Sequence, residues 1–342
     1  MKRKLKYLGL MAVACIAFMT ACMYLDSISI DQPQEDGTMA PQIKAGEVAT
    51  FKINGYVAPN ADQKSRFVVA MLAPRGWNIA QNAEVSFTGT QITESPDHVY
   101  TMKVIPANEA PKNMPGLTWP DALMQRLGLG PNRYNDMEWV AWQADEAIQA
   151  YNGSHADYEV TLKVKVGPEN LKAGLGFFIN NIDDGLTGDD RYYKYMFSDA
   201  FTVYGGTGEE IDYTSVRFYS VEPSRSLQDD IITFTFDGDA YDNPLSEEPE
   251  IYMECAAVTE SGNRYPGARI PMIRESVTTH SYSATLWPVG HFGIPEGETV
   301  TDIEYSFTNG NGTIVINKSY EMEVSGKEHD SDDIPFSFTL RC

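Results

Sequence analysis

Short segments in which apolar and polar residues alternate recur along most of the chain. They are rich in Val, Thr, Phe and Tyr, and Gly, Pro or Asn separates them. Alternation at every second residue is typical of a β-strand with one buried face. Short strands at this spacing predict a mainly β protein built from sandwiches. The segments are 47–57, 65–74, 83–92, 98–106, 158–166, 174–180 and 200–205, then 215–221, 230–236, 251–259, 281–289, 302–309, 312–324 and 335–341.

Residues 118–151 break this pattern and predict a helical insertion. Thr118 suits a helix cap, because Pro120 follows in the first turn and Gly128 stands where the helix would end. Asn135 precedes Glu138 by three residues, an arrangement similar to a capping box. We therefore expect a second helix from about residue 136 to 149.

In that second helix, the apolar residues Met137, Val140, Ala141, Ala144, Ile148 and Tyr151 form one stripe. Trp139 and Trp142 fall nearly opposite it, beside Glu138 and Gln149. An exposed pair of indoles next to carboxylate and amide groups suits a neutral glycan, whose C–H faces stack on aromatic rings. The pattern predicts a glycan-binding site at these four residues, with burial of both indoles as the alternative.

The chain divides into two tandem immunoglobulin-like β-sandwich domains. The glycine-rich run 205–210 predicts a flexible break, which leaves 47–205 as the first domain and 211–342 as the second. Residues 22–46 are polar and rich in turn formers, as expected of a tether. The sequence Asn-Gly-Asn-Gly at 309–312 predicts a tight hairpin, because both residue types tolerate positive φ.

The first residues have the composition of a signal peptide. Four basic residues precede an apolar run of 12 residues from Tyr7 to Phe18, which is shorter than a membrane-spanning helix. The next residues, 19–22, read Met-Thr-Ala-Cys and resemble the bacterial lipobox. We expect removal of residues 1–21, lipidation of Cys22 and attachment to the outer membrane, with a plain secretory signal ending at Ala21 as the alternative.

The charge balance narrows the choice of partners. Loss of the four basic residues at the start leaves 22 Lys and Arg against 48 Asp and Glu, a formal charge of −26. Such a surface repels phosphate backbones and anionic head groups, so nucleic acid is not expected as a partner. Neutral or cationic ligands and Ca²⁺ stay open.

Residues 286–316, LWPVGHFGIPEGETVTDIEYSFTNGNGTIVI, resemble the closing module of lipoproteins from Bacteroidetes glycan-utilisation loci. The shared motifs are a Trp-Pro pair, an aromatic-Gly-Ile-Pro-Glu-Gly turn and a Tyr-x-Phe-x-Asn strand. The resemblance implies a polysaccharide-binding protein at the cell surface beside SusC-like and SusD-like proteins. It transfers no catalytic residue, because these positions belong to turns and core strands.

Sequence motifs for catalysis are absent. Gly-x-Ser-x-Gly, the phosphate loop and His-Glu-x-x-His do not occur, and the five histidines are scattered. A glycosidase would need a carboxylate pair, for which Glu138 is the first candidate.

No cofactor is expected, although two loops could offer Ca²⁺ ligands or serve only as turns. Their acidic residues are Asp183, Asp184, Asp189 and Asp190 in one, and Asp237, Asp239 and Asp242 in the other.

Two thiols remain after processing besides the anchor, Cys255 and Cys342, and they either pair or stay separate.

Three functions follow from these patterns. The first is a surface-exposed, non-catalytic glycan-binding lipoprotein of a polysaccharide-uptake system. The second is a structural or adhesive lipoprotein that binds protein partners, and the third is a glycoside-acting enzyme.

Overall fold

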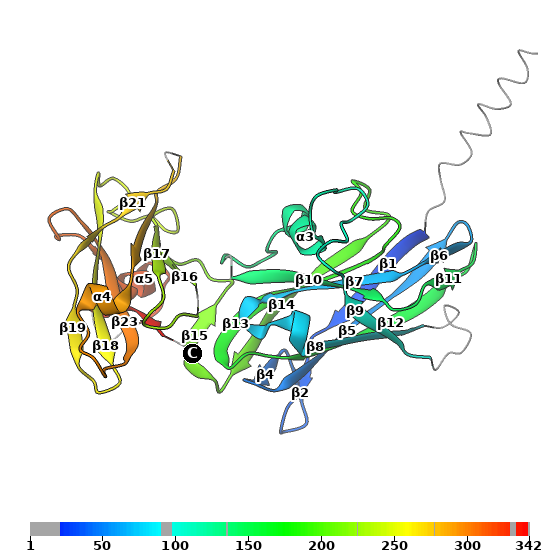
Figure 1. Ribbon diagram of the computed structural model, residues 1–342, viewed down its shortest axis with the longest axis horizontal. Helices are drawn as coiled ribbons and strands as arrows, with labels where there is room; N and C mark the ends of the chain where they lie inside the picture. Colours follow the sequence, from blue (N-terminus) through cyan, green and yellow to red (C-terminus); the bar gives the residue numbers. More distant parts are fainter. Residues whose placement is uncertain are drawn as a thin grey trace, which may run out of the picture. The chain divides into compact units, whose positions relative to one another are not determined.

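The computed structural model describes residues 21–89, 98–134, 136–223, 225–276, 278–328 and 333–340. The chain forms two compact units that divide between Thr214 and Ser215 (Figure 1). Each unit is a β-sandwich with its own hydrophobic core, which confirms the predicted mainly β, tandem immunoglobulin-like architecture. Most of the signal peptide, Asn135 and Cys342 lie outside the described residues. Among the described residues, no helix is long and apolar enough to span a membrane.

The first sandwich is one hydrogen-bonded path of strands that folds into two layers. Its order is β1-β5-β12-β8-β9-β10-β7-β13-β14-β4, and β15 pairs with β13. The bounds are β1 Ala21–Ser29, β4 Gln42–Lys44, β5 Val48–Pro59, β7 Phe67–Pro74, β8 Ala83–Gly89, β9 Tyr100–Val104, β10 Met137–Ala144, β12 Ala156–Lys165, β13 Glu169–Asn181, β14 Lys194–Tyr204 and β15 Thr207–Asp212.

Strand β9 joins the two layers, because it pairs with β8 on one side and with β10 on the other. The core between the layers is aromatic. Phe51 of β5 contacts Phe177 of β13 and Phe201 of β14, with ring centroids 6.0 and 5.2 Å apart. Smaller elements close the ends: β2 Gln32–Pro33 with β3 Met39–Ala40, β6 Gln63–Ser65 with β11 Ile148–Ala150, the 3-10 helix η1 Arg75–Trp77 and the helix α2 Ile79–Asn82.

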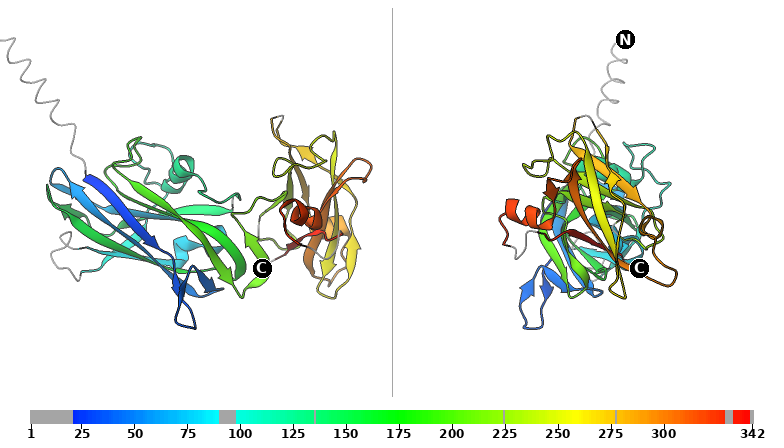
Figure 2. Two further views of the ribbon diagram at one scale, coloured as in Figure 1. Left: turned by 180° about the vertical axis from the view of Figure 1, so that it is seen from behind. Right: turned by 90° about the vertical axis from the view of Figure 1, so that its left-hand side faces the viewer.

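The first predicted helix of the insertion is confirmed. Helix α3 spans Trp119–Leu127, the hydroxyl of Thr118 accepts a hydrogen bond from the Asp121 amide, and Gly128 ends the helix. It is teal in Figure 2 and lies against the outer side of the β10 layer.

The second predicted helix is wrong, because residues 137–144 form β10 and residues 148–150 form β11. β10 is hydrogen-bonded to β7 throughout and is buried on both faces. A strand buried on both faces shows no alternation, so its sequence offers no period-2 signal.

The predicted tether is also wrong. Residues 21–29 form β1, which pairs antiparallel with β5 from Ala21↔Pro59 to Ser29↔Lys52. The register shifts between Leu25 and Ser27, so Asp26 bulges and the alternation of the strand is interrupted. This interruption explains why the segment reads as irregular in the sequence.

The glycine-rich run is not a flexible break between domains. Residues 207–212 form β15, which pairs in parallel with the start of β13, and the amide of Tyr213 donates to the carbonyl of Lys172. The first unit therefore extends to Thr214, nine residues beyond the predicted end at 205.

The second sandwich has two facing sheets. One is ordered β16-β17-β22-β21; in the other, β19-β18-β23-β24 form the path while β20 and β25 pair with β18 and β23. The bounds are β16 Tyr219–Glu222, β17 Ile232–Asp237, β18 Ile251–Thr259, β19 Arg264–Pro266, β20 Ile270–Pro271, β21 Ile273–Arg274, β22 Ser281–Leu286, β23 Val300–Asn309, β24 Val315–Ile316 and β25 Phe336–Thr339. Helix α4 spans Pro288–Phe292.

Rings from β17 and β23 fill the space between these sheets. Phe234 lies 4.9 Å from Tyr305, and Phe236 lies 4.8 Å from Phe307, between centroids. The predicted hairpin at 309–312 is confirmed, since β23 and β24 pair across it. The predicted long strand after it is wrong beyond Ile316, because helix α5 occupies Lys318–Val324, capped by the Asn317 side chain.

Candidate functional site

The two tryptophans of the predicted glycan platform are buried. Trp139 is 1% exposed and Trp142 is 2% exposed. They stand three residues apart on β10 and so face opposite sides of the sheet. Trp139 packs against Phe197 under α3 and donates from Nε1 to the Gly128 carbonyl at 3.0 Å. The prediction of two exposed indoles on one helix face is therefore wrong.

The two polar residues of that predicted site are not brought together. Glu138 lies at the start of β10, where burial raises its pKa and Arg75, 3.9 Å away, partly opposes the shift. Gln149 lies beyond the other end of β10, in β11, which pairs with β6. No shared binding surface results for Glu138, Trp139, Trp142 and Gln149.

The acidic loops use their carboxylates in local hydrogen bonds. Asp183 accepts from Ser65, Asp184 from Asn181 and Asp189 from Arg191 in a bidentate pair. In the other loop, Asp237 accepts from the Asp239 amide and Asp239 pairs with His280. Among the residues with described positions, no group of three or more His, Cys, Asp or Glu side chains could hold a metal ion.

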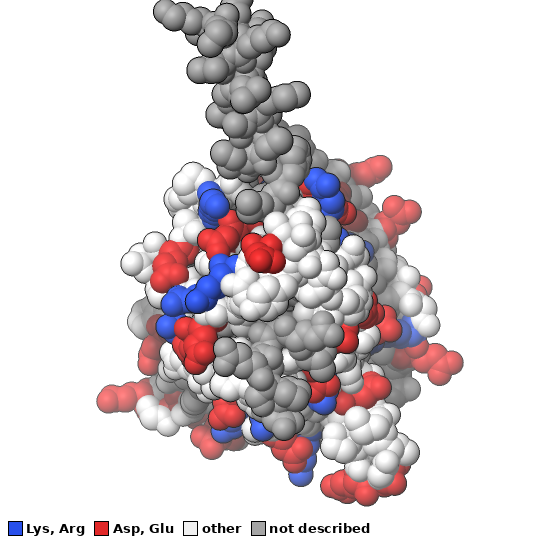
Figure 3. Space-filling model, turned by 90° about the vertical axis from the view of Figure 1, so that its right-hand side faces the viewer, with Lys and Arg blue, Asp and Glu red and all other residues white. Residues whose placement is uncertain are grey.

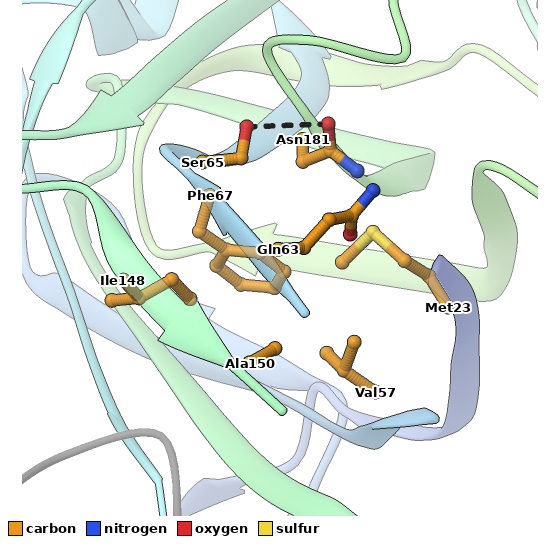
Figure 4. Close-up of a pocket in the computed structure, with 8 residues that line it drawn as sticks. All are labelled: Met23, Val57, Gln63, Ser65, Phe67, Ile148, Ala150 and Asn181. Carbon is orange, nitrogen blue, oxygen red and sulfur yellow. Dashed lines mark hydrogen bonds between the residues drawn. The ribbon is translucent and has the colours of Figure 1, made fainter. Parts of the chain in front are cut away.

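A small recess opens at one end of the first sandwich (Figure 4). It encloses about 370 Å³, part of which is open to solvent. The Ser65 hydroxyl there donates to Asn181 Oδ1 at 3.3 Å and to Asp183 at 2.7 Å. The lining residues include no acidic side chain, so the recess offers no carboxylate pair for glycoside hydrolysis. They are Met23, Val57, Gln63, Ser65, Phe67, Ile148, Ala150 and Asn181.

Trp287 is the exposed indole of this chain. It keeps 50% of its surface accessible, whereas the other four tryptophans are at most 2% exposed. The ring packs against Gly290 of α4, because a Cβ atom at that residue would stand only 2.3 Å from the Cε3 atom of the indole. The α4 backbone therefore covers part of the indole and leaves the rest to solvent.

The surface next to Trp287 is the outer face of the β16-β17-β22-β21 sheet. Ile232, Phe234 and Phe236 point inward from β17, so Thr233 and Thr235 point outward. On β22, Ser283 and Thr285 point outward by the same alternation. Thr233 lies opposite Thr285, and their hydroxyl oxygens are 3.1 Å apart.

We call this surface the hydroxyl face and define it by Ile231, Thr233, Thr235, Ser283, Thr285 and Trp287. Extending the β17–β22 register by one pair places Ile231, which is 68% exposed, opposite Trp287. The first charged side chain on these two strands is Asp237, paired with Ser281 at the far end. A neutral strip of about 13 Å, at 3.3 Å per residue, therefore runs from Trp287 towards Ser283.

The sequence contains the signal for this site. In SYSATLW the residues Ser281, Ser283, Thr285 and Trp287 share one parity, and Tyr282, Ala284 and Leu286 share the other. Continuing the alternation one residue past the strand assigns Trp287 to the solvent side. The prediction from the sequence relied on Trp139 and Trp142 of the supposed helix and included Trp287 only in the Trp-Pro pair of residues 286–316.

Residues 26–217 match the family described as "Domain of unknown function (DUF4961)". The match covers 192 of the 342 residues, which is more than half of the chain. The chain belongs to this family. The DUF4961 region begins inside β1 and ends within three residues of the division between the two sandwiches. Residues 219–316 of the second sandwich match "Domain of unknown function (DUF8578)".

No curated protein sequence matches the DUF4961 chain. Similar solved structures include the C-terminal domain of the Streptococcus pyogenes antigen I/II-family protein AspA, at 8% identity over 95% of this chain and 99% of that chain, with a TM-score of 0.24. A collagen-binding domain from a Staphylococcus aureus adhesin matches at 10% identity over 54% of this chain and 97% of that one, with a TM-score of 0.20. AvmM, which catalyses macrocyclization in alchivemycin A biosynthesis, matches at 10% identity over 55% and 92%, with a TM-score of 0.28. At these TM-scores the matches carry no argument about function.

Proposed function

We propose that this protein is a lipid-anchored, non-catalytic binding protein of the outer membrane that holds a neutral glycan on the hydroxyl face. The observation that supports the proposal is Trp287, an indole that is half exposed and packs against Gly290 of α4. An exposed aromatic ring that continues into a row of hydroxyl groups suits a sugar chain.

The chemistry of the face fits a neutral sugar chain. The negative face of an indole attracts the weakly positive C–H groups on one side of a pyranose ring. The hydroxyl groups of Thr233, Thr285 and Ser283 can each donate one hydrogen bond and accept others, as sugar hydroxyls do. Because these groups and the sugar hydroxyls are all hydrated before binding, each new hydrogen bond replaces bonds to water and adds little net affinity per sugar.

Charge favours the same class of ligand. The whole chain has a formal charge of −22, whereas the six residues of the hydroxyl face are uncharged and Glu222 of β16 borders them as the cross-strand partner of Thr233. An anionic polysaccharide would be repelled by the surrounding surface, whereas a neutral one would not. Attachment through Cys22 and cooperation with SusC-like and SusD-like proteins belong to the same proposal, on the lipobox at 19–22 and the resemblance at 286–316.

Affinity electrophoresis in gels that contain neutral polysaccharides tests the proposal. We expect the parent to be retarded by at least one glycan, and Trp287→Ala to migrate as in a gel without glycan. Tyr204→Ala is the matched control, because it removes an aromatic ring that is 40% exposed in the other sandwich. A Trp287→Ala variant that is retarded as strongly as the parent would contradict the proposal.

The second candidate function is adhesion to a protein partner. It is favoured by two exposed aliphatic residues, Ile231 at 68% opposite Trp287 and Leu227 at 47% four residues earlier in the chain. The double change Thr233→Val and Thr285→Val separates the two candidates. It removes two hydroxyl groups at nearly constant volume, so glycan binding should weaken, while an apolar contact with a protein should persist or strengthen.

A further inference from the structure

The strand that begins at the proposed lipidation site is part of the first sandwich from its first residues. Cys22 stands opposite Ala58 in the β1–β5 register, and the next residue, Met23, is 2% exposed in the core. The acylated position is thus directly followed by a residue of the packed interior, about 3.3 Å further along the strand. The chain therefore has no slack between the anchor and the folded domain.

Three contacts fix this end of β1. The Tyr158 hydroxyl donates to the Tyr24 carbonyl at 2.6 Å. The rings of Tyr24 and Tyr56 stack with centroids 4.3 Å apart and an interplanar angle of 8°. The Met23 amide donates to the Arg191 carbonyl at 3.4 Å. Release of the strand would break all of these contacts, so the anchor position is rigid relative to the sandwich.

Two connections form the tip of the sandwich beside this position. Pro59 follows Ala58, the partner of Cys22, and accepts a hydrogen bond from the Gly153 amide at 2.9 Å. The Asn152 amide donates to Asp62 at 2.9 Å. We define the tip as residues 59–62 and 151–155. Tyr151 is 59% exposed on it.

The end of the first sandwich at which β1 starts carries uncharged and charged residues side by side. Figure 3 looks onto this end and shows a patch of uncharged residues with both Asp or Glu and Lys or Arg side chains around it. Tyrosine suits the boundary between water and lipid, since its ring is apolar and its hydroxyl stays hydrated.

We propose that, once Cys22 is acylated, the tip rests on the lipid head groups with Tyr151 in the interfacial layer. This inference rests on the lipid anchor of the proposed function. It differs from that function in assigning a contact between the folded domain and the membrane, where a tethered domain would move freely above it. The sandwich then stands on the membrane in one orientation.

Lipidated full-length protein in vesicles of phosphatidylethanolamine and phosphatidylcholine, whose head groups carry no net charge, tests the contact. A Cys342→Ser background would receive Tyr151→Cys or, as a control, Tyr204→Cys, each labelled with a fluorophore. Residue 204 lies at the far end of β14, whose other end is at residue 194 near Arg191. Cys255 is buried and should not take up label.

Lipids with a spin label on the head group should quench the fluorophore at 151 and leave the one at 204 bright. A Gly-Ser spacer of about 12 residues after Cys22, which spans about 20 Å, should abolish the quenching at 151 while the protein still floats with vesicles. Equal fluorescence at 151 and 204 in floated protein would overturn the membrane contact alone. Protein that does not float with vesicles would overturn the lipid anchor and this contact together. The glycan-binding part of the proposed function would still be tested by the retardation of the parent and of Trp287→Ala in polysaccharide gels.

Discussion

The hydroxyl of Tyr158 reaches past Gly55 to donate a 2.6 Å hydrogen bond to the carbonyl oxygen of Tyr24. Tyr158 belongs to β12 and Tyr24 to β1, and β5 lies between them. A Cβ atom at residue 55 would stand 2.0 Å from the Tyr24 oxygen and 2.4 Å from the Tyr158 hydroxyl. The absence of a side chain at Gly55 thus allows the hydrogen bond between β12 and β1 to pass across β5 at the start of the domain.

We predict that Gly55→Ala detaches the first residues of β1 from β5 and lowers the melting temperature, because the new methyl group has no space. Tyr158→Phe should be milder and cost about 1 kcal/mol, the usual contribution of one hydrogen bond. Thermal unfolding followed by circular dichroism measures both. A Gly55→Ala protein as stable as the parent would show that β1 can shift without cost.

The tryptophans should fall into two classes when replaced by Ala. Trp139→Ala and Trp142→Ala each remove a fully buried ring and should cost about 3–5 kcal/mol in the free energy of unfolding. Trp287→Ala removes a half-exposed ring and should cost less than half as much. Urea unfolding of the three single variants decides, and a Trp142→Ala protein of parental stability would contradict the observed core.

Burial raises the pKa of Glu321, whose carboxylate accepts a hydrogen bond from the Phe218 amide at 2.8 Å. The folded protein therefore holds this proton more tightly than the unfolded chain, so the residue costs stability as the pH rises through the raised pKa. We predict that Glu321→Gln is more stable than the parent at pH 7 and that the advantage disappears below about pH 4, where both states of the parent are protonated.

Glu323→Gln is the control for that comparison, since it makes the same change at an exposed position on the same helix. Urea midpoints at the two pH values give the result. A Glu321→Gln protein that is less stable than the parent at pH 7 would mean that the carboxylate's charge strengthens the bond to Phe218 by more than its burial costs.

Cys255 should resist alkylation in the folded protein. It is 9% exposed, and burial together with the nearby Glu254 carboxylate raises its pKa to about 12. Only the thiolate reacts, and almost none is present at neutral pH. Iodoacetamide should modify this residue in urea and leave it intact in buffer, as read by peptide mass spectrometry. Rapid labelling in buffer would indicate that β18 opens locally.

The sequence predicts the strands of this fold best where one face of the strand is buried and the other is exposed to solvent. β5 and β12 alternate along their whole length, and both were expected as strands. β10 was mistaken for a helix because α3 covers its outer face, so residues on both faces are buried and the sequence shows no alternation. β1 was missed because the bulge at Asp26 interrupts its alternation after five residues.

The candidate site shows the same limit from the other side. An exposed indole can be predicted only if the element that presents it is predicted correctly. Trp139 and Trp142 were assigned to solvent from a helical period that the chain does not have, whereas Trp287 follows a strand whose period is real. Burial of Trp139 depends on the packing of α3, which ends ten residues before β10 begins. Burial of Trp142 depends on the core of the sandwich, and the sequence pattern shows neither.

The pairing of β1 also decides how the first sandwich responds to pulling. If the proposed lipid anchor and ligand contact both form, force between the membrane and the ligand enters at Cys22 and leaves the first unit at Thr214. These points lie at opposite ends of the strands, because β1 starts beside the tip and β15 pairs with the opposite end of β13. The eight paired residues of β1 and β5 would then be sheared together, not peeled apart one by one. Rupture in shear requires many hydrogen bonds to fail at once. Forced unfolding depends on the unfolding rate under load, so we expect this geometry to give an anchored protein high resistance to pulling by flow.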